Sequence, residues 1–144
     1  MTKSDEAVAS YGSRFTCSAA VFAAFSEDLG LDPDMAKKIA CGFGAGISKT
    51  GNTCGAVSGA ILVIGLKYGK TKVEDDAATE KTRALVRQFI REFTEKNGSI
   101  NCTELLGYNL DNPEEFAQAR DKRLFISKCT PLVRDAADIL EKIL

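Results

Sequence analysis

The feature that most constrains the fold of this chain is an apolar segment behind a glycine-rich loop. From residue 56 to residue 66 every side chain is non-polar, with Ser58 and two glycines as the exceptions. A helix of this composition is apolar on all sides, and such a helix is buried inside a protein. We therefore predict a central helix that starts at Cys54 and ends near Tyr68.

The glycine-rich loop before this helix has the sequence GFGAGISKTGNT. Its glycines can adopt positive φ angles without steric cost, so the loop can fold over a small object. Its last residue, Thr53, is typical of an N-cap and would place Cys54 at the first helical position. A thiolate at that position would be stabilised by the positive end of the helix dipole.

Composition indicates one helical domain that spans residues 1–144. A chain of 144 residues with 44% hydrophobic side chains can bury one core and is too short for two to be expected. The 19 basic and 20 acidic residues give a net charge of −1, and no block of like charge occurs. We therefore expect no nucleic-acid partner.

Nothing in the sequence resembles an export signal or a membrane span. The chain begins MTKSDEAVAS, which lacks the basic start and the apolar run of a secretory signal. The longest nearly apolar run, 55–66, is shorter than the roughly 18 residues that cross a bilayer. We expect a cytoplasmic protein without a membrane span.

Five cysteines and no histidine narrow the possible chemistry. Without an imidazole the chain cannot build a serine or cysteine hydrolase triad, a histidine-ligated zinc site or a histidine-ligated haem. An odd number of cysteines in a cytoplasmic chain argues against a framework of structural disulfides. The thiols are therefore candidates for metal binding, redox exchange or simple burial.

Hydrophobic periodicity and capping residues predict helices along the whole chain, and no alternating pattern predicts a strand. After an initial turn or two, the predicted helices are 17–29, 33–40, 54–68, 77–96, a short helix from 102, a helix from 113, and 131–144. The predicted fold is all-α, a compact bundle of about five to seven helices around the central apolar helix.

Four of the cysteines share a position at or just before a predicted helix start. They are Cys17, Cys54, Cys102 and Cys129. The residues expected to cap these helices are Thr16 or Ser13 for the first, and Thr53, Asn101 and Thr130 for the others. A helix start lowers the pKa of a thiol, in favourable cases to roughly 3.5–7.5, which favours the reactive thiolate. The fifth cysteine, Cys41, follows a helix end, and we expect it to be a small buried hydrophobe.

Three interpretations of these thiols stay open. In the first, a thiolate attacks a partner disulfide and a neighbouring cysteine resolves the mixed disulfide. In the second, the same four thiolates hold one metal ion or iron–sulfur cluster, although the paired spacing usual in zinc sites is absent. In the third, all the thiols are structural and the protein is a helical interaction module.

The motifs around the four cysteines resemble a redox-active family named for its C_GCAxxG_C_C pattern. The family cysteines fall on Cys17 in TCSAAVFAAF, on Cys54 in CGAVSG, on Cys102 in CTELLGYNL and on Cys129 before the closing helix. The match covers nearly the whole chain and leaves Cys41 outside the pattern. The resemblance implies four functional cysteines and supplies no substrate.

Thiol-based redox chemistry is therefore the function that the sequence favours, either as dithiol/disulfide exchange or as electron transfer. Cys54 is the preferred attacking thiolate, with Cys17, Cys102 or Cys129 as its resolving partner. The alternative is a metal site, for zinc or an iron–sulfur cluster, with the same four cysteines as ligands. The redox partner stays unidentified, and the apolar surface of 61–66 and of the last helix leaves a homodimer open.

Overall fold

Two buried helices, α2 (Cys17–Ser26) and α5 (Gly55–Tyr68), pack together at the centre of the computed structural model, which describes residues 1–144. Helix α5 is buried from its first residue through Ala60 and again at Val63 and Ile64. The predicted central apolar helix is therefore present.

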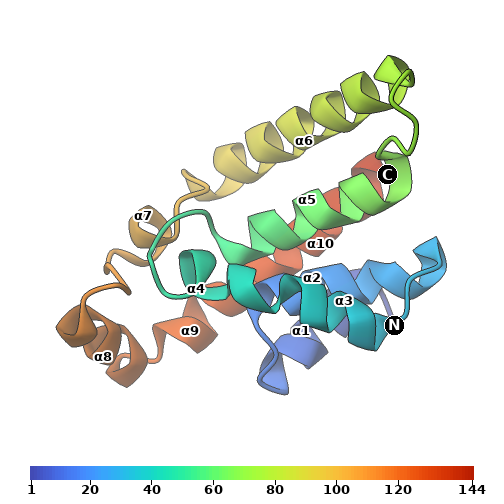
Figure 1. Ribbon diagram of the computed structural model, residues 1–144. Helices are drawn as coiled ribbons and strands as arrows, with labels where there is room; N and C mark the ends of the chain where they lie inside the picture. The colour runs from blue at the N-terminus through green and yellow to red at the C-terminus, as the bar shows by residue number, and fades with distance from the viewer.

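The other helices surround this pair (Figure 1). In chain order they are α1 (Lys3–Gly12), α3 (Pro33–Ala40), α4 (Gly44–Ile47), α6 (Asp76–Asn97), α7 (Cys102–Leu106), α8 (Pro113–Asp121), α9 (Leu124–Ser127) and α10 (Cys129–Ile143), with the 3-10 helices η1 (Glu27–Leu29) and η2 (Cys41–Phe43). Seven helices have eight or more residues, namely α1, α2, α3, α5, α6, α8 and α10. The structure has no β-strand, so the predicted all-α fold is confirmed.

Apolar side chains form two separate clusters. The main core has 22 buried residues, drawn from α1, α2, α3, α6 and α10 and from α5 with the residue before it. Phe89, Phe93 and Ile64 are its largest fully buried side chains. A side cluster of four buried residues consists of Cys102, Leu106, Leu110 and Ala119. Figure 1 shows α7, α8 and α9, which surround the side cluster, together at one end of the molecule.

Several of the predicted caps are present. The Thr16 hydroxyl accepts from the amide of Ala19 at 3.1 Å and caps α2. The Asn101 side chain likewise caps α7, accepting from the amide of Glu104 at 3.1 Å.

Two predicted caps are wrong. Cys54 is itself the N-cap of α5, because Thr53 pairs with Asn101 in an isolated antiparallel bridge. Helix α10 begins at Cys129, two residues before the predicted start, so Thr130 lies inside the helix and does not cap it.

The glycine-rich loop contains a left-handed turn made mostly of residues other than glycine. Five consecutive residues have φ between 50° and 67°: Ala45, Gly46, Ile47, Ser48 and Lys49. Left-handed backbone costs about 1–2 kcal/mol for each residue with a side chain. Gly44, by contrast, has a φ of −68°, and its missing side chain leaves room for Thr16.

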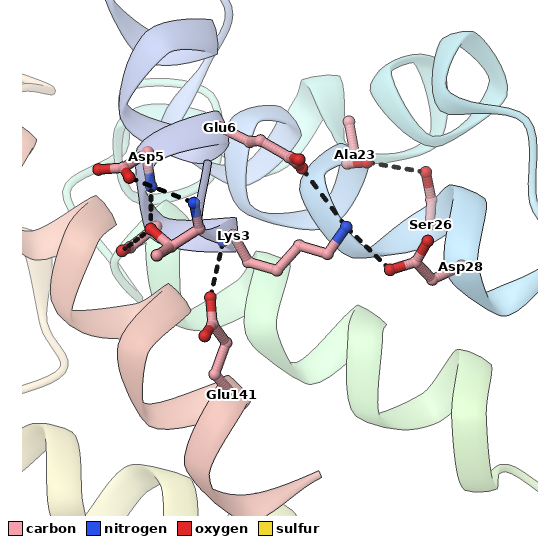
Figure 2. A network of polar contacts seen from close by, with 9 residues as sticks. Lys3, Asp5, Glu6, Ala23, Ser26, Asp28 and Glu141 are labelled. Carbon is pink, nitrogen blue, oxygen red and sulfur yellow. Dashed lines mark hydrogen bonds and ion pairs between the residues drawn. The ribbon is translucent and has the colours of Figure 1, made fainter.

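Polar contacts join the two ends of the chain (Figure 2). The ammonium of Lys3 lies 2.9 Å from a carboxylate oxygen of Asp28 and 3.4 Å from one of Glu6. The backbone amide of Lys3 donates to Glu141 at 2.7 Å. Ion pairs at the surface contribute only about 0–1 kcal/mol each, so these contacts set the position of α1 more than the stability.

None of the helices combines the length and the apolar composition that crossing a membrane would require.

The α2–α5 contact generates a test of the fold. A Cβ atom at Gly59 would lie 2.6 Å from the Ser18 carbonyl oxygen, so Gly59→Ala should lower the free energy of unfolding by about 1–3 kcal/mol. In the same helix, a Cβ atom at Gly65 would meet nothing within 4 Å. Gly65→Ala should therefore raise stability by about 0.5–1 kcal/mol. Denaturant unfolding of both variants measures the difference, and equal effects would contradict the close approach.

Candidate functional site

All four cysteines of the predicted set line one apolar cavity of about 50 Å³. The cavity lies between the two apolar clusters. Cys17 and Cys54 pack in the main core, whereas Cys102 and Cys129 pack in the side cluster. The other lining residues carry no charge and are Ala45, Gly46, Gly55, Ala56, Leu105, Leu106, Leu110, Phe125 and Leu132.

Each thiol reaches the cavity from the start of a different helix. Cys17, Cys102 and Cys129 are the first residues of α2, α7 and α10, and Cys54 is the N-cap of α5. Figure 1 shows the starts of α2, α5 and α10 on the side of the molecule where α4 and α9 lie. The four cysteines, each at the start of a helix, therefore meet at one cavity in the structure.

A single antiparallel bridge joins the segment that carries Cys54 to the segment that carries Cys102. The amide of Cys54 donates to the carbonyl of Ile100 at 2.7 Å, and the amide of Cys102 donates to the carbonyl of Asn52 at 2.7 Å. The bridged pair between these bonds is Thr53 and Asn101. Because side chains alternate along extended backbone, Cys54 and Cys102 point to the same side of the bridge.

Two glycines allow backbone to approach the thiols. A Cβ atom at Gly55 would overlap with Cys17 Sγ, so Cys17 lies directly against the first turn of α5. A Cβ atom at Gly46 would lie 2.7 Å from Cys102 Cβ, and the φ of Gly46 is +66°. Any side chain at either position would fill space that a cysteine occupies.

Backbone amides favour a thiolate at Cys17. Burial raises the pKa of this thiol, and hydrogen bonds from four backbone amides oppose the increase. These amides belong to Ala45, Ser18, Cys17 and Gly55. The left-handed turn supplies the amide of Ala45, and the first turns of α2 and α5 supply the others. Converging amides of this kind form a site that stabilises an anion.

Cys129 has a different partner, the hydroxyl of Tyr11. This hydroxyl donates to the carbonyl oxygen of Phe125 at 2.7 Å, and the side chain of Phe125 lines the cavity. A hydrogen bond with Tyr11 also lowers the pKa of Cys129, although burial outweighs it and the pKa is raised to about 12. Burial raises the pKa of Tyr11 itself, so its hydroxyl keeps its proton.

The expected lowering of thiol pKa values at helix starts is wrong for this site. Burial, followed by the charge of a thiolate at Cys17, raises the pKa of Cys54 to about 12. Burial and the charges of Cys54 and Cys17 raise the pKa of Cys102 to about 12 as well. The free energy lost when a thiolate is removed from water exceeds the stabilisation that the helix ends and amides provide. The thiols are therefore mainly protonated at neutral pH.

The prediction for Cys41 is also wrong. This residue was expected to be buried, but it is exposed at the end of α3, outside the cavity. Ala40, the last residue of α3, is the buried one: its carbonyl accepts from the Ser18 hydroxyl at 2.8 Å. The helix therefore turns its next residue, Cys41, toward solvent.

Sequence reasoning missed Tyr11, Ala45 and Phe125 as parts of the site. Nothing in the local pattern distinguishes Tyr11 from any half-buried residue of an amphipathic helix. Ala45 lies in the glycine-rich loop, and the prediction that this loop folds over something small is the one signal that could have found it. Phe125 belongs to no motif of the sequence that would mark it as part of a site.

The arrangement of donors bears on the metal interpretation. No three or more cysteine, aspartate or glutamate side chains are grouped in a way that could hold a metal ion. Four thiols around one cavity are nevertheless the donor type that zinc and iron–sulfur clusters take. Metal binding by Cys17, Cys54, Cys102 and Cys129 stays a prediction.

The fold and the cavity define a small all-α protein with four cysteines gathered at one uncharged site. The chain belongs to the family described as "Putative redox-active protein (C_GCAxxG_C_C)", whose model matches residues 15–143. An uncharacterized protein of Archaeoglobus fulgidus is 32% identical over 132 residues, which cover 85% of this chain and 80% of the relative. No solved structure matches the chain.

The raised pKa values predict slow alkylation of the cavity. Iodoacetamide reacts with thiolates, so modification of Cys54, Cys102 and Cys129 should be slow at pH 7. Because each pKa is about 12, the rate should increase about tenfold per pH unit up to pH 10 without levelling off. Mass spectrometry follows each site, and the exposed Cys41 should be modified first. A plateau below pH 9 at any of the three buried sites would contradict this assignment.

Proposed function

We propose that this protein performs thiol–disulfide exchange at the cavity, with Cys17 as the attacking thiol and Cys54 as the resolving thiol. The observation that supports this function best is the convergence of four cysteines from four helix starts on one uncharged cavity. Membership of a family described as redox-active agrees with it.

Two features favour Cys17 over Cys54 for the first attack. Cys17 is half-buried, whereas Cys54 is only 6% exposed, so a partner disulfide reaches Cys17 more easily. Four backbone amides also favour the Cys17 thiolate. A thiolate at Cys17 raises the pKa of each of the other three thiols, so these three stay protonated while Cys17 reacts.

The proposed exchange consists of two steps. The Cys17 thiolate attacks one sulfur of a partner disulfide, forms a mixed disulfide, and releases the other partner sulfur as a thiolate, which takes up a proton. The Cys54 thiol then loses its proton and attacks the Cys17 sulfur, which releases the second partner thiol. Two electrons pass to the partner, and Cys17 and Cys54 become joined in a disulfide.

The other two cysteines form a second dithiol on the side-cluster wall. The bridge joins the segments of Cys54 and Cys102, and both thiols line the cavity, which offers a route by which Cys102 attacks the oxidised pair. Cys129 then loses its proton and attacks the Cys102 sulfur, which releases the remaining main-core cysteine as a thiolate that takes up a proton. The hydrogen bond with Tyr11 favours the attacking Cys129 thiolate. The disulfide thereby moves from Cys17 and Cys54, which pack in the main core, to Cys102 and Cys129, which pack in the side cluster.

Oxidation of the reduced protein by glutathione disulfide tests this proposal. Free thiols should decrease two at a time, and peptide mapping should find the first disulfide between Cys17 and Cys54. Cys17→Ser should slow the first step by at least about tenfold, because the amide-stabilised thiolate is lost. Cys41→Ser is the matched control and should leave the rate of cavity oxidation unchanged, since Cys41 lies outside the cavity.

Equal rates for the two serine variants would contradict the proposal. Elemental analysis of protein purified without oxygen separates the metal alternative: one metal ion or cluster per chain would favour metal binding. Loss of that metal in Cys17→Ser, but not in Cys41→Ser, would assign it to the cavity.

A further inference from the structure

A second hollow, outside the thiol cavity, lies between the loop before α2 and the last turn of α3. This basic groove encloses about 430 Å³. Its lining residues are Arg14, Phe15, Thr16, Ala19, Lys37, Lys38 and Cys41. Three of the seven are cations and none is a carboxylate. In a chain whose net charge is −1, this is a local concentration of positive charge.

Two of the three cations are free to bind an external anion. Lys37 pairs with Asp34 at 3.8 Å and lies over the ring of Phe15, 4.3 Å from its centre. Arg14 and Lys38 are exposed and form no ion pair. Charges lining a concave surface focus the field and attract molecules of opposite sign.

One exposed apolar side chain, Phe15, lines the groove, and other exposed apolar side chains follow it along the chain. Of the nine large hydrophobic residues that are exposed in the chain, five lie between residues 15 and 47. They are Phe15, Met35, Ile39, Phe43 and Ile47. Met35 and Ile39 lie on α3, Phe43 on η2 and Ile47 on α4. Apolar patches with a polar rim are typical of protein interfaces.

Only one layer of backbone separates the groove from the thiol cavity. Thr16 lines the groove, and the next residue, Cys17, lines the cavity. On the other side of this wall, a Cβ atom at Gly44 would lie 2.7 Å from Thr16 Cβ, and Ala45 lines the cavity. A molecule seated in the groove therefore contacts the residue that precedes Cys17, the cysteine to which we assign the first attack.

We propose that the basic groove, with the exposed Phe15 in its wall, docks the redox partner, and that this partner is a protein with carboxylates around its own disulfide. The charge of the groove selects the carboxylates, and the exposed apolar side chains supply contact area. The partner's redox role rests on the proposed function, whereas the docking of an acidic surface does not.

A non-reacting probe tests the docking without thiol chemistry. The probe is a fluorescent peptide with four glutamates around two serines, and its counterpart has four lysines. Fluorescence anisotropy at low salt should show that the intact reduced protein binds the acidic peptide and not the basic one. The binding should weaken as salt is added, because the charges are exposed.

Charge reversal in the groove should weaken this binding. The double variant Arg14→Glu, Lys38→Glu should raise the Kd of the acidic peptide by about tenfold or more. The matched control is Arg87→Glu, Lys72→Glu, which changes the net charge equally at exposed residues away from the groove. The control should change the Kd less than about twofold. Circular dichroism checks that both variants are folded.

Three results would overturn the docking proposal. In the first, the acidic peptide does not bind at all, and in the second, its Kd increases equally in the two double variants. In the third result, this chain forms a dimer that only the groove variant abolishes. The last result would assign the groove to a second copy. Because the probe has no thiol, each of these results leaves the exchange at Cys17 to be judged by its own experiment.

Discussion

The close approach of α2 to α5 is the contact on which the rest of the structure depends. It requires Gly55 and Gly59, because a side chain at either position would meet Cys17 Sγ or the Ser18 carbonyl. The two glycines lie four residues apart and therefore face the same neighbour. The same contact packs the main core and fixes one wall of the thiol cavity, so stability and site geometry have a common origin.

The second constraint is the cost of charge in the cavity that this packing creates. Thiols at helix ends are expected to ionise easily, yet the pKa values of Cys54, Cys102 and Cys129 are raised to about 12 because apolar side chains exclude water. Four neighbouring thiols also cannot all become anions, since each charge disfavours the next. The site is therefore suited to holding one thiolate at a time, and the amides around Cys17 decide which one.

The left-handed turn at residues 45–49 connects these two constraints. Ile47 is β-branched, and a positive φ is unusual for such a residue. Backbone strain persists only where the surrounding structure compensates for it, and it concentrates at functional sites. Here the strained segment brings the amide of Ala45 to Cys17 and lets Gly46 approach Cys102.

The sequence by itself determined the all-α fold, the central helix and the placement of four cysteines at helix starts. These follow from side-chain periodicity and from caps such as Thr16 and Asn101, which act over one or two turns. Only the tertiary structure decided the raised pKa values of the thiols and the exposure of Cys41. It also decided that Thr53 pairs with Asn101 instead of capping α5, and that Tyr11 lies at Cys129. Each of these depends on which distant segment displaces water or supplies an amide, and no local pattern carries that information.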